Sequence, residues 1–171
     1  MALLQVRHYP DTVLTKISRP VTEFDAGLRT LATDMVETMY AAPGVGLAGP
    51  QVAVLKRVVV IDCGDKDDPK LVVAVNPEIL EYDGESYEEE GCLSVPEYYA
   101  NVKRSAWVRV RFQNLQGEAV ELETEGLLAV CFQHEIDHLN GKLFVDRLSS
   151  LKKGIFRKKY KKIMEQRQEQ L

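Results

Sequence analysis

The sequence is poor in the features that mark secreted or membrane-anchored proteins. It holds only three cysteines, an odd number without regular spacing, which does not indicate a disulfide framework. No segment approaches the ~20 consecutive apolar residues of a membrane-spanning helix. The opening segment MALLQVRHYP lacks the charged start and apolar run of a signal peptide, and the Arg- and Ser-rich composition of an organelle leader. We therefore expect a protein of a reducing cytoplasm without a membrane partner.

Internal repeats and low-complexity linkers are also absent, so residues 1–171 are expected to form a single domain. With 45% hydrophobic residues, a chain of this length can bury a core of its own, and we expect it to be a monomer. Segments typical of strands outnumber those typical of helices, and the two kinds do not alternate regularly. This pattern predicts the α+β class with a mainly antiparallel sheet.

Individual elements follow from apolar periodicity and turn residues. Asp25 can cap a helix that runs to about Ala41. Strands are expected at residues 58–61, 71–75, 79–82, 107–112 and 119–123, with Asn76-Pro77 separating the second from the third. The glycine-rich segment GVGLAGPQ at residues 44–51 excludes a regular helix and lets the backbone pass close to another group. It does not follow the G-x-G-x-x-G pattern, which argues against a dinucleotide loop.

Histidine is scarce as well, yet two of the three histidines lie in the motif QHEIDHLNG at residues 133–141. His134 and His138 are four residues apart, so on a helix they share one face and can bind one metal ion at about 2.0–2.1 Å. Glu135 stands where a carboxylate acts as general base in metal-assisted hydrolysis. A surface helix that carries two histidines by chance is the alternative, but H-E-x-x-H is expected by chance in fewer than about one in a hundred such chains.

The residues before this motif predict that its helix is buried. The run from Leu127 to Phe132 contains no polar residue, and a helix that is apolar all round belongs in a core. Thr124 is the expected N-cap and Gly141 follows the expected end. We therefore predict that the H-E-x-x-H helix is buried in the core.

A catalytic metal site needs a third protein ligand and an open position. Cys131 shares the helix with the histidines, but it lies seven residues before His138, about 10.5 Å along the axis, so we expect it to pack beside the site. Cys63 is most simply a small buried residue at the end of a strand. Cys92 follows an acidic run in a segment with turn residues and is the best cysteine candidate, although a distant Asp or Glu remains an alternative.

The C-terminal segment, residues 150–171, has a charge opposite to that of the rest of the chain. It carries a net charge of +6, whereas the preceding residues carry −10. Phe156, Tyr160, Ile163 and Met164 share one face of a helix that we expect to begin after Gly154. Such a basic amphipathic helix favours an anionic partner, and a merely solvated helix face is the alternative.

Three segments of the chain resemble the signature segments of the peptide deformylases: GVGLAGPQ, EGCLS and QHExDHLxG. This family removes the formyl group from the N-terminal methionine of new bacterial chains. The resemblance implies antiparallel sheets around a central buried H-E-x-x-H helix. The resemblance implies that Cys92, His134 and His138 bind the metal and that Glu135 is the acid and base. It also implies that the Gln51 side chain and the Leu93 N–H face the substrate carbonyl. The implied metal is Fe2+, which Zn2+, Ni2+ or Co2+ can replace, although the ligand types alone favour zinc.

The resemblance also suggests how a formyl-Met peptide binds. We expect an extended peptide to lie along the backbone of Gly44, Val45, Gly46 and Gly91, as an added strand does. Val130 and Cys131 are expected to line the slot for the methionine side chain. The chain differs from the family at Gly49, where Ala is usual, and at Tyr98-Tyr99, where several members carry Arg. We expect the first change to loosen the loop slightly and the second to make the cavity rim aromatic.

Two other functions use some of the same residues. A zinc endopeptidase has the same H-E-x-x-H helix with a carboxylate as third ligand, and a binding module with a structural metal needs a fourth protein ligand. If the chain is a deformylase, its substrate emerges from the ribosome, whose surface is polyanionic RNA. We therefore expect residues 152–167 to dock there without reading base sequence.

Overall fold

The computed structural model describes residues 2–169 as a mixture of helices and antiparallel strands. Its α-helices are α1 (Ala26–Ala41), α2 (Gly126–Leu139) and α3 (Ser150–Glu169), with short 3-10 helices at Thr12–Thr15, Gly49–Val52 and Phe144–Arg147. Its strands are β1 (Gly46–Ala48), β2 (Val58–Asp62), β3 (Leu71–Asp83), β4 (Ser86–Cys92), β5 (Val95–Arg104), β6 (Trp107–Gln113) and β7 (Ala119–Glu125). Within this described part, no helix combines the length and apolarity needed to cross a membrane.

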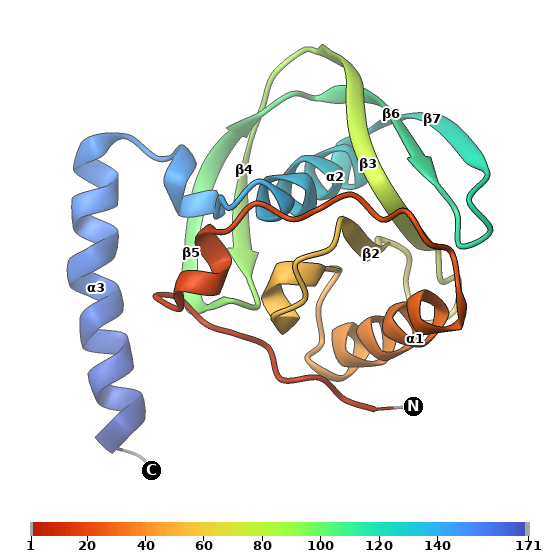
Figure 1. Cartoon of the computed structure of the whole chain (residues 1–171). Coiled ribbons are helices and arrows are strands. Elements are labelled where there is room, and N and C mark those ends of the chain that lie inside the picture. Colours follow the sequence, from red (N-terminus) through yellow and green to blue (C-terminus); the bar gives the residue numbers. More distant parts are fainter. Residues whose placement is uncertain (1, 170–171) are drawn as a thin grey trace.

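The strands form two antiparallel sheets around α2. One has the order β1-β2-β3-β6-β7, and the other is the β4-β5 hairpin, which closes through a two-residue turn at Leu93-Ser94. Figure 1 shows α2 in the middle of the molecule, α1 on one side of the larger sheet and α3 along the outside. The predicted α+β class with antiparallel sheets is confirmed.

Helix α1 forms where the sequence predicted it. The Asp25 side chain accepts a hydrogen bond from the Leu28 N–H at 3.0 Å, which satisfies one of the free donors at the helix start. Met35 and Met39 are fully buried on its inner face, in a cluster with Leu47 and Val60. This helix therefore supports β1, the strand that borders the predicted site.

Helix α2 is buried along most of its length, as predicted, but the expected N-cap at Thr124 is wrong. The helix begins at Gly126, after Glu125, and no side chain caps its first turn. Thr124 belongs to β7, whose pairing with β6 continues to Glu125 and holds the backbone extended. Gly126, at φ +68°, provides the abrupt change from strand to helix.

Strand β3 runs through the predicted break at Asn76-Pro77. Asn76 has φ +52°, and the register with β6 shifts between Val75 and Glu78. Such a bulge accommodates a proline, which cannot donate to the ladder. The Asn76 side chain holds this conformation because it exchanges two hydrogen bonds with the backbone of Val21, at 2.8 and 2.9 Å.

Helix α3 is attached to the domain by aromatic rings. Phe156 and Tyr160 are each 3% exposed and pack edge-on to Tyr9, with ring centroids 5.2 and 5.4 Å away. The predicted apolar face is therefore present, but the expected start after Gly154 is wrong. The helix begins at Ser150 because Ser149 accepts hydrogen bonds from N–H groups of the first turn. Gly154 lies within the helix, on a side where an added Cβ would meet no other atom within 4 Å.

Candidate metal centre

Three predicted ligands come together from two elements. Cys92 ends β4, and α2 places His134 and His138 on one face one turn apart. The Cys92 sulfur lies 3.4 Å from Nε2 of His138, which lies 3.2 Å from Nε2 of His134. All three ligand atoms lie within 4.8 Å of one another. The three side chains therefore converge on one point.

This spacing fits a metal ion better than a set of hydrogen bonds. Ligand bonds of about 2.0–2.3 Å at tetrahedral angles separate neighbouring ligand atoms by about 3.3–3.6 Å. The observed separations, 3.2 and 3.4 Å, are close to that range. Two nitrogens and one thiolate leave a fourth position free for water or substrate, which is the arrangement of a catalytic rather than a structural site.

The alternatives for the third ligand are not brought to this point. No Asp or Glu whose side chain the structure describes joins the group formed by Cys92, His134 and His138. Cys131 stays outside it, as the helix geometry predicted, and its sulfur instead lies 3.5 Å from that of Cys63. The ligand set of an ordinary zinc endopeptidase is therefore not present here.

A buried network of charges holds His134 in place. Glu90 Oε1 lies 3.0 Å from Nδ1 of His134, and both oxygens of Glu90 accept hydrogen bonds from Arg104, at 2.9 and 3.0 Å. Arg104 also donates to Asp137 at 2.7 Å, and Arg147 donates twice to the same carboxylate. With the Nδ1 proton held by Glu90, Nε2 keeps its lone pair for an ion.

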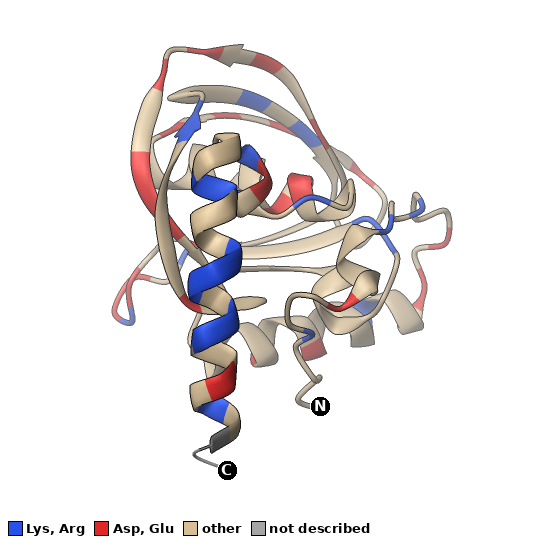
Figure 2. Ribbon diagram, turned by 90° about the vertical axis from the view of Figure 1, so that its left-hand side faces the viewer, with Lys and Arg blue, Asp and Glu red and all other residues tan. Residues whose placement is uncertain are grey.

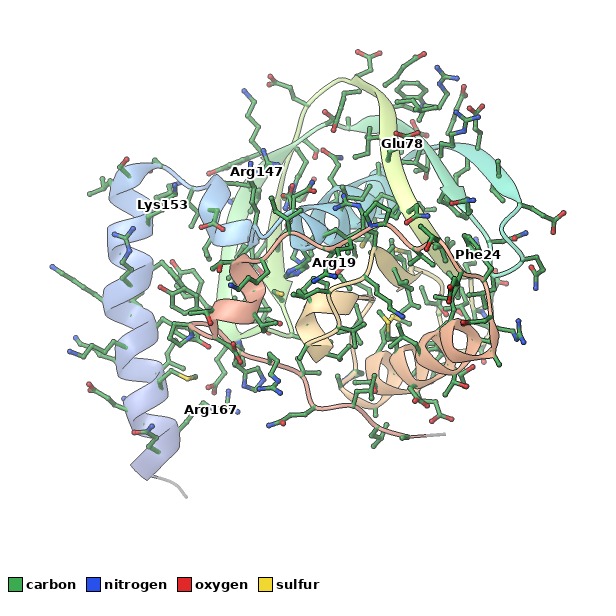
Figure 3. All side chains as sticks on the ribbon, in the orientation of Figure 1. Arg19, Phe24, Glu78, Arg147, Lys153 and Arg167 are labelled. Atoms are coloured by element: carbon green, nitrogen blue, oxygen red, sulfur yellow. The ribbon has the colours of Figure 1, made fainter. Side chains whose placement is uncertain are left out.

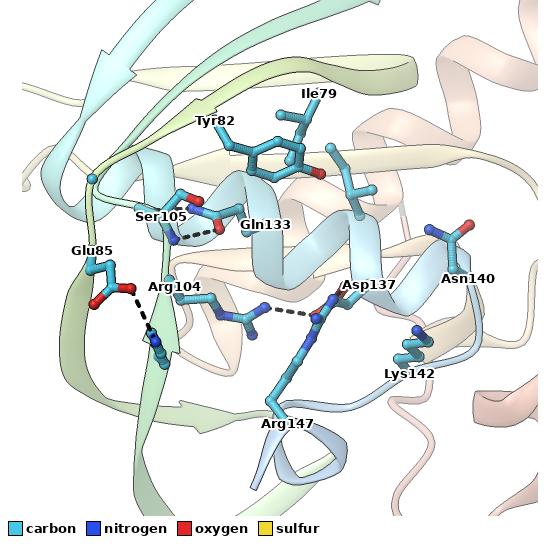
Figure 4. A pocket seen from close by; sticks show the side chains of 13 residues that line it. Ile79, Tyr82, Glu85, Arg104, Ser105, Gln133, Asp137, Asn140, Lys142 and Arg147 are labelled. Carbon is cyan, nitrogen blue, oxygen red and sulfur yellow. Dashed lines mark hydrogen bonds and ion pairs between the residues drawn. The ribbon is translucent and has the colours of Figure 1, made fainter.

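Figure 4 shows the Arg104 end of this network from another face of α2, where a second cavity of about 440 Å³ opens. Sequence reasoning missed Glu90, Arg104 and Asp137. Glu90 begins the EGCLS segment and Asp137 lies in the QHExDHLxG segment, but no role was predicted for either residue, and nothing else local separates the buried Glu90 from its exposed neighbours Glu88 and Glu89. The contacts of the three missed residues join residues 14 to 44 positions apart, which no local pattern indicates.

Burial and neighbouring charges shift the pKa values of the two histidines in opposite directions. Burial lowers the pKa of His138 well below its usual value, and the charge on His134 adds to this effect. Burial also works against a charged His134, but the anionic groups around it, Glu135 first among them, raise its pKa well above the usual value. A neutral His138 has a nitrogen lone pair available to bind a metal ion. The negative charges around His134 favour a positive charge at this place, which a metal cation can supply.

Glu135 lies beside the three candidate ligands but does not belong to the group in which they converge. It is 4% exposed, and its Oε1 atom has no hydrogen-bond partner among the described residues. Burial raises its pKa to about 7. The other oxygen lies against Gly46, where an added Cβ would come within 2.4 Å of Oε2. The glycine at this position therefore makes room for the carboxylate.

Gln51 faces the same point from the glycine-rich segment. Its Oε1 atom accepts a hydrogen bond from the Ala48 N–H at 2.9 Å, which fixes the amide so that Nε2 points toward Cys92. Nε2 also donates to Ser94 Oγ at 3.0 Å.

Gly49 lies in the same loop, where an added Cβ would lie 2.6 Å from two backbone carbonyl oxygens. As it stands, this backbone leaves no room for a larger residue at position 49.

These groups face a cavity of about 1030 Å³. The predicted site residues that line it are Gly44, Val45, Gly46, Gln51, Gly91, Cys92, Leu93, Val130, Cys131, His134 and Glu135. His138 lies one turn deeper and is 1% exposed. The cavity thus combines an apolar wall with a cluster of ionisable groups at its floor, which suits a substrate with both characters.

The prediction of an aromatic rim is correct for one of its two tyrosines. Tyr99 lines the cavity, and its ring lies against Gly91, where a Cβ would meet it at 2.6 Å. Tyr98 points to the opposite face of β5 and packs on Phe156, with ring centroids 4.7 Å apart. Neighbouring residues of a strand alternate in direction, so only one of the pair can reach the rim.

Comparisons with known proteins agree with this geometry. The family model described as polypeptide deformylase matches residues 3–154. The chain is 54% identical to peptide deformylase 1 of Burkholderia multivorans, over 95% of this chain and 90% of that protein, and 52% identical to peptide deformylase of Hahella chejuensis, over 95% and 96%. The crystal structure of a peptide deformylase from Legionella pneumophila superposes with a TM-score of 0.90 at 50% identity, covering 97% of this chain and 98% of that one.

Proposed function

The chain belongs to the polypeptide deformylase family, and we propose that Cys92, His134 and His138 hold its catalytic metal ion. It hydrolyses the N-formyl group of the N-terminal formyl-methionine of newly made polypeptides and releases formate. The observation that carries the assignment of residues is the convergence of one sulfur and two imidazole nitrogens within 4.8 Å at the floor of the large cavity.

The family is metal-dependent, and we propose Fe2+ as the native ion, with Zn2+, Ni2+ or Co2+ as substitutes. When bound, such an ion supplies a Lewis acid for the formyl carbonyl and lowers the pKa of a water molecule toward 7. We propose that the residues of the chain supply three other things: a buried site for the cation, hydrogen-bond donors to the oxygen on which negative charge develops, and a group that carries the proton.

Glu135 is the proposed proton carrier. A carboxyl group with a pKa of about 7 is near the ideal for general acid and base catalysis at neutral pH, because it both takes up and releases a proton readily. We propose that it takes a proton from the attacking water and delivers it to the amine that leaves. Its unpaired Oε1 atom is the oxygen available for this transfer.

Gln51 and the backbone N–H of Leu93 are the proposed donors to the formyl oxygen. The Gln51 amide is already oriented by Ala48 and Ser94, so little reorganisation accompanies the reaction. Loss of one such donor typically lowers the rate about 10²–10³-fold. We propose that the peptide backbone follows Gly44, Val45, Gly46 and Gly91, as an added strand does, and that the methionine side chain lies against Val130 and Cys131.

Turnover of formyl-Met-Ala compared with acetyl-Met-Ala tests the function. We propose that the groups around the formyl position leave no room for the extra methyl group of acetyl, so we expect release of formate and no measurable release of acetate. Glu135→Gln should keep about one metal ion per chain and lose nearly all turnover. Comparable rates on the two peptides, or full metal and full activity in Cys92→Ser, contradict the proposed reaction and ligand set respectively.

We also propose that α3 docks the enzyme on ribosomal RNA in the cytoplasm. Lys and Arg follow one another along most of α3 (Figure 2), and those from 157 to 159 and at 161 and 162 are exposed while Phe156 and Tyr160 are buried. Near its end, Arg167 turns back toward the domain, 3.9 Å from Glu97 (Figure 3). The apolar face is therefore used by the domain, and the basic face is free for phosphates.

Because removing α3 would expose its buried rings, charge substitution is the sharper test of docking. Replacing Lys158, Lys159 and Lys162 by Gln should weaken co-sedimentation with ribosomes and reduce its dependence on salt, since each phosphate contact releases counterions. Turnover of a short formyl peptide should not change. A monomer is expected in the same sedimentation experiments. Unchanged co-sedimentation of the triple variant contradicts docking through this face.

A further inference from the structure

The two cysteines that are not metal ligands lie side by side. Cys63 follows β2, Cys131 lies on α2, and their sulfurs are 3.5 Å apart although 68 residues separate them in sequence. Both are free thiols. A disulfide has an S–S length of about 2.05 Å, so closing this pair requires the sulfurs to approach by about 1.5 Å. Both residues pack on the same core cluster, with no other side chain between the sulfurs.

A small reagent can reach this pair from two directions. Cys131 lines the substrate cavity, and Cys63 is half-buried at the start of the loop that joins β2 to β3. The hydrogen bond between the two sulfurs lowers the pKa of Cys63 and raises the pKa of Cys131, and burial of Cys131 raises the pKa of that residue further. Cys63 is thus the more nucleophilic sulfur, and Cys131 is the partner within reach.

We propose that Cys63 and Cys131 are a redox-active dithiol, which a hydroperoxide converts reversibly to a disulfide. The Cys63 sulfur attacks the peroxide, the O–O bond breaks, and the products are a sulfenic acid on Cys63 and an alcohol or water. The Cys131 sulfur then attacks the Cys63 sulfur, the S–O bond breaks, and the hydroxyl leaves as water with the proton of Cys131. The two thiols lose two electrons, and the peroxide is reduced.

The disulfide links β2 to α2 one turn before His134 and Glu135. It also draws the Cys131 sulfur from the cavity wall toward Cys63, which changes the surface offered to the substrate. We therefore expect a severalfold lower kcat/KM with an unchanged metal content. Disulfide formation does not depend on deformylation, so the chemistry can be tested even if the proposed function is wrong.

The test uses the full chain loaded with Zn2+, because zinc has no redox chemistry and keeps Cys92 coordinated. After treatment with hydrogen peroxide, free thiols are alkylated and peptides are mapped by mass spectrometry. We expect the loss of two of the three thiols, a peptide linked through Cys63 and Cys131, and recovery of both thiols with dithiothreitol. Zinc content, measured in parallel, should stay at one ion per chain.

Cys63→Val is the matched control, because it removes the attacking sulfur and leaves the proposed ligands and cavity residues in place. It should turn over formyl peptide like the wild type before oxidation, form no linked peptide, and keep its kcat/KM after brief peroxide treatment. A disulfide that includes Cys92, separate sulfinic acids on Cys63 and Cys131, or three thiols surviving in folded wild-type protein each overturn the proposal.

Discussion

Replacing Glu90 by Gln tests whether the buried charge network holds the metal site together. Glu90 accepts three hydrogen bonds, one from His134 and two from Arg104, through both of its oxygens. An amide of the same shape offers one oxygen and one NH₂ group. Whichever way it is oriented, the NH₂ group faces a donor, either Nδ1 of His134 or the guanidinium of Arg104.

The expected size of the effect follows from these contacts. Loss of a carboxylate that orients a metal-ligating histidine typically costs about 10- to 100-fold in metal affinity, which corresponds to about 1.4–2.7 kcal/mol. Arg104 keeps its bond to Asp137 but loses its other carboxylate partner while remaining 6% exposed. Removing one partner of a buried ion pair typically lowers the free energy of unfolding by about 3–5 kcal/mol. Because Arg104 keeps Asp137 as a partner, we expect a loss at the lower end of this range.

The assay is competition for Zn2+ against a chelator of known affinity, with the free energy of unfolding measured by urea denaturation on the same samples. Glu89→Gln is the matched control: it makes the same chemical change one residue earlier in β4, on a side chain that faces solvent. Turnover at saturating metal separates weaker metal binding from a misplaced imidazole. If both variants bind Zn2+ equally well and unfold at the same urea concentration, the reasoning about Glu90 is refuted.

Three further changes test other parts of the structure. Gly46→Ala should lower kcat by about 10² with metal content retained, because its Cβ displaces the Glu135 carboxylate; Gly154→Ala, whose Cβ meets nothing within 4 Å, is the control and should not change turnover. Phe156→Ala should destabilise the protein by about 3–5 kcal/mol, seen as a lower urea midpoint, because its ring is 3% exposed among other aromatic rings. Removal of the metal by a chelator should lower Tm, since a ligand that binds only the folded state stabilises it; an unchanged Tm contradicts the metal site.

Local patterns predicted the parts of the fold whose determinants are close in sequence. The Asp25 cap and the buried face of α1 lie within one helix, and the histidine pair of α2 is separated by a single turn. Two expectations failed because a neighbouring strand overrode a local signal. Thr124 is a good N-cap residue, but its pairing with β6 keeps it in β7. The break expected at Pro77 became a bulge, because Asn76 is held by contacts 55 and 37 residues away.

The same contrast holds for the candidate site: residues within one motif were predicted, whereas residues brought together from distant positions were not. His134, Glu135 and His138 follow from one motif, whereas Cys92 was the best of several third ligands until the family resemblance was considered. No role was predicted for Arg104, or for Glu90 although it begins the EGCLS segment, because a charged side chain on a strand is usually exposed. In the structure, Glu90 differs from Glu89 because its carboxylate reaches His134 on α2.

The position of Glu90 also explains why a carboxylate stands two residues before the proposed ligand Cys92. A buried cation site needs nearby negative charge, but a lone buried carboxylate is costly unless it is paired and hydrogen-bonded. Glu90 and Asp137 supply the negative charge, and Arg104 lies between them and offsets it. The arrangement holds the His134 ring in place, and it leaves no carboxylate oxygen hydrogen-bonded to the His138 ring among the described residues. Burial lowers the pKa of His138 well below its usual value and raises the pKa of Glu135 to about 7, with smaller contributions from Arg104 and Glu90, and this is the combination that metal binding and proton transfer require.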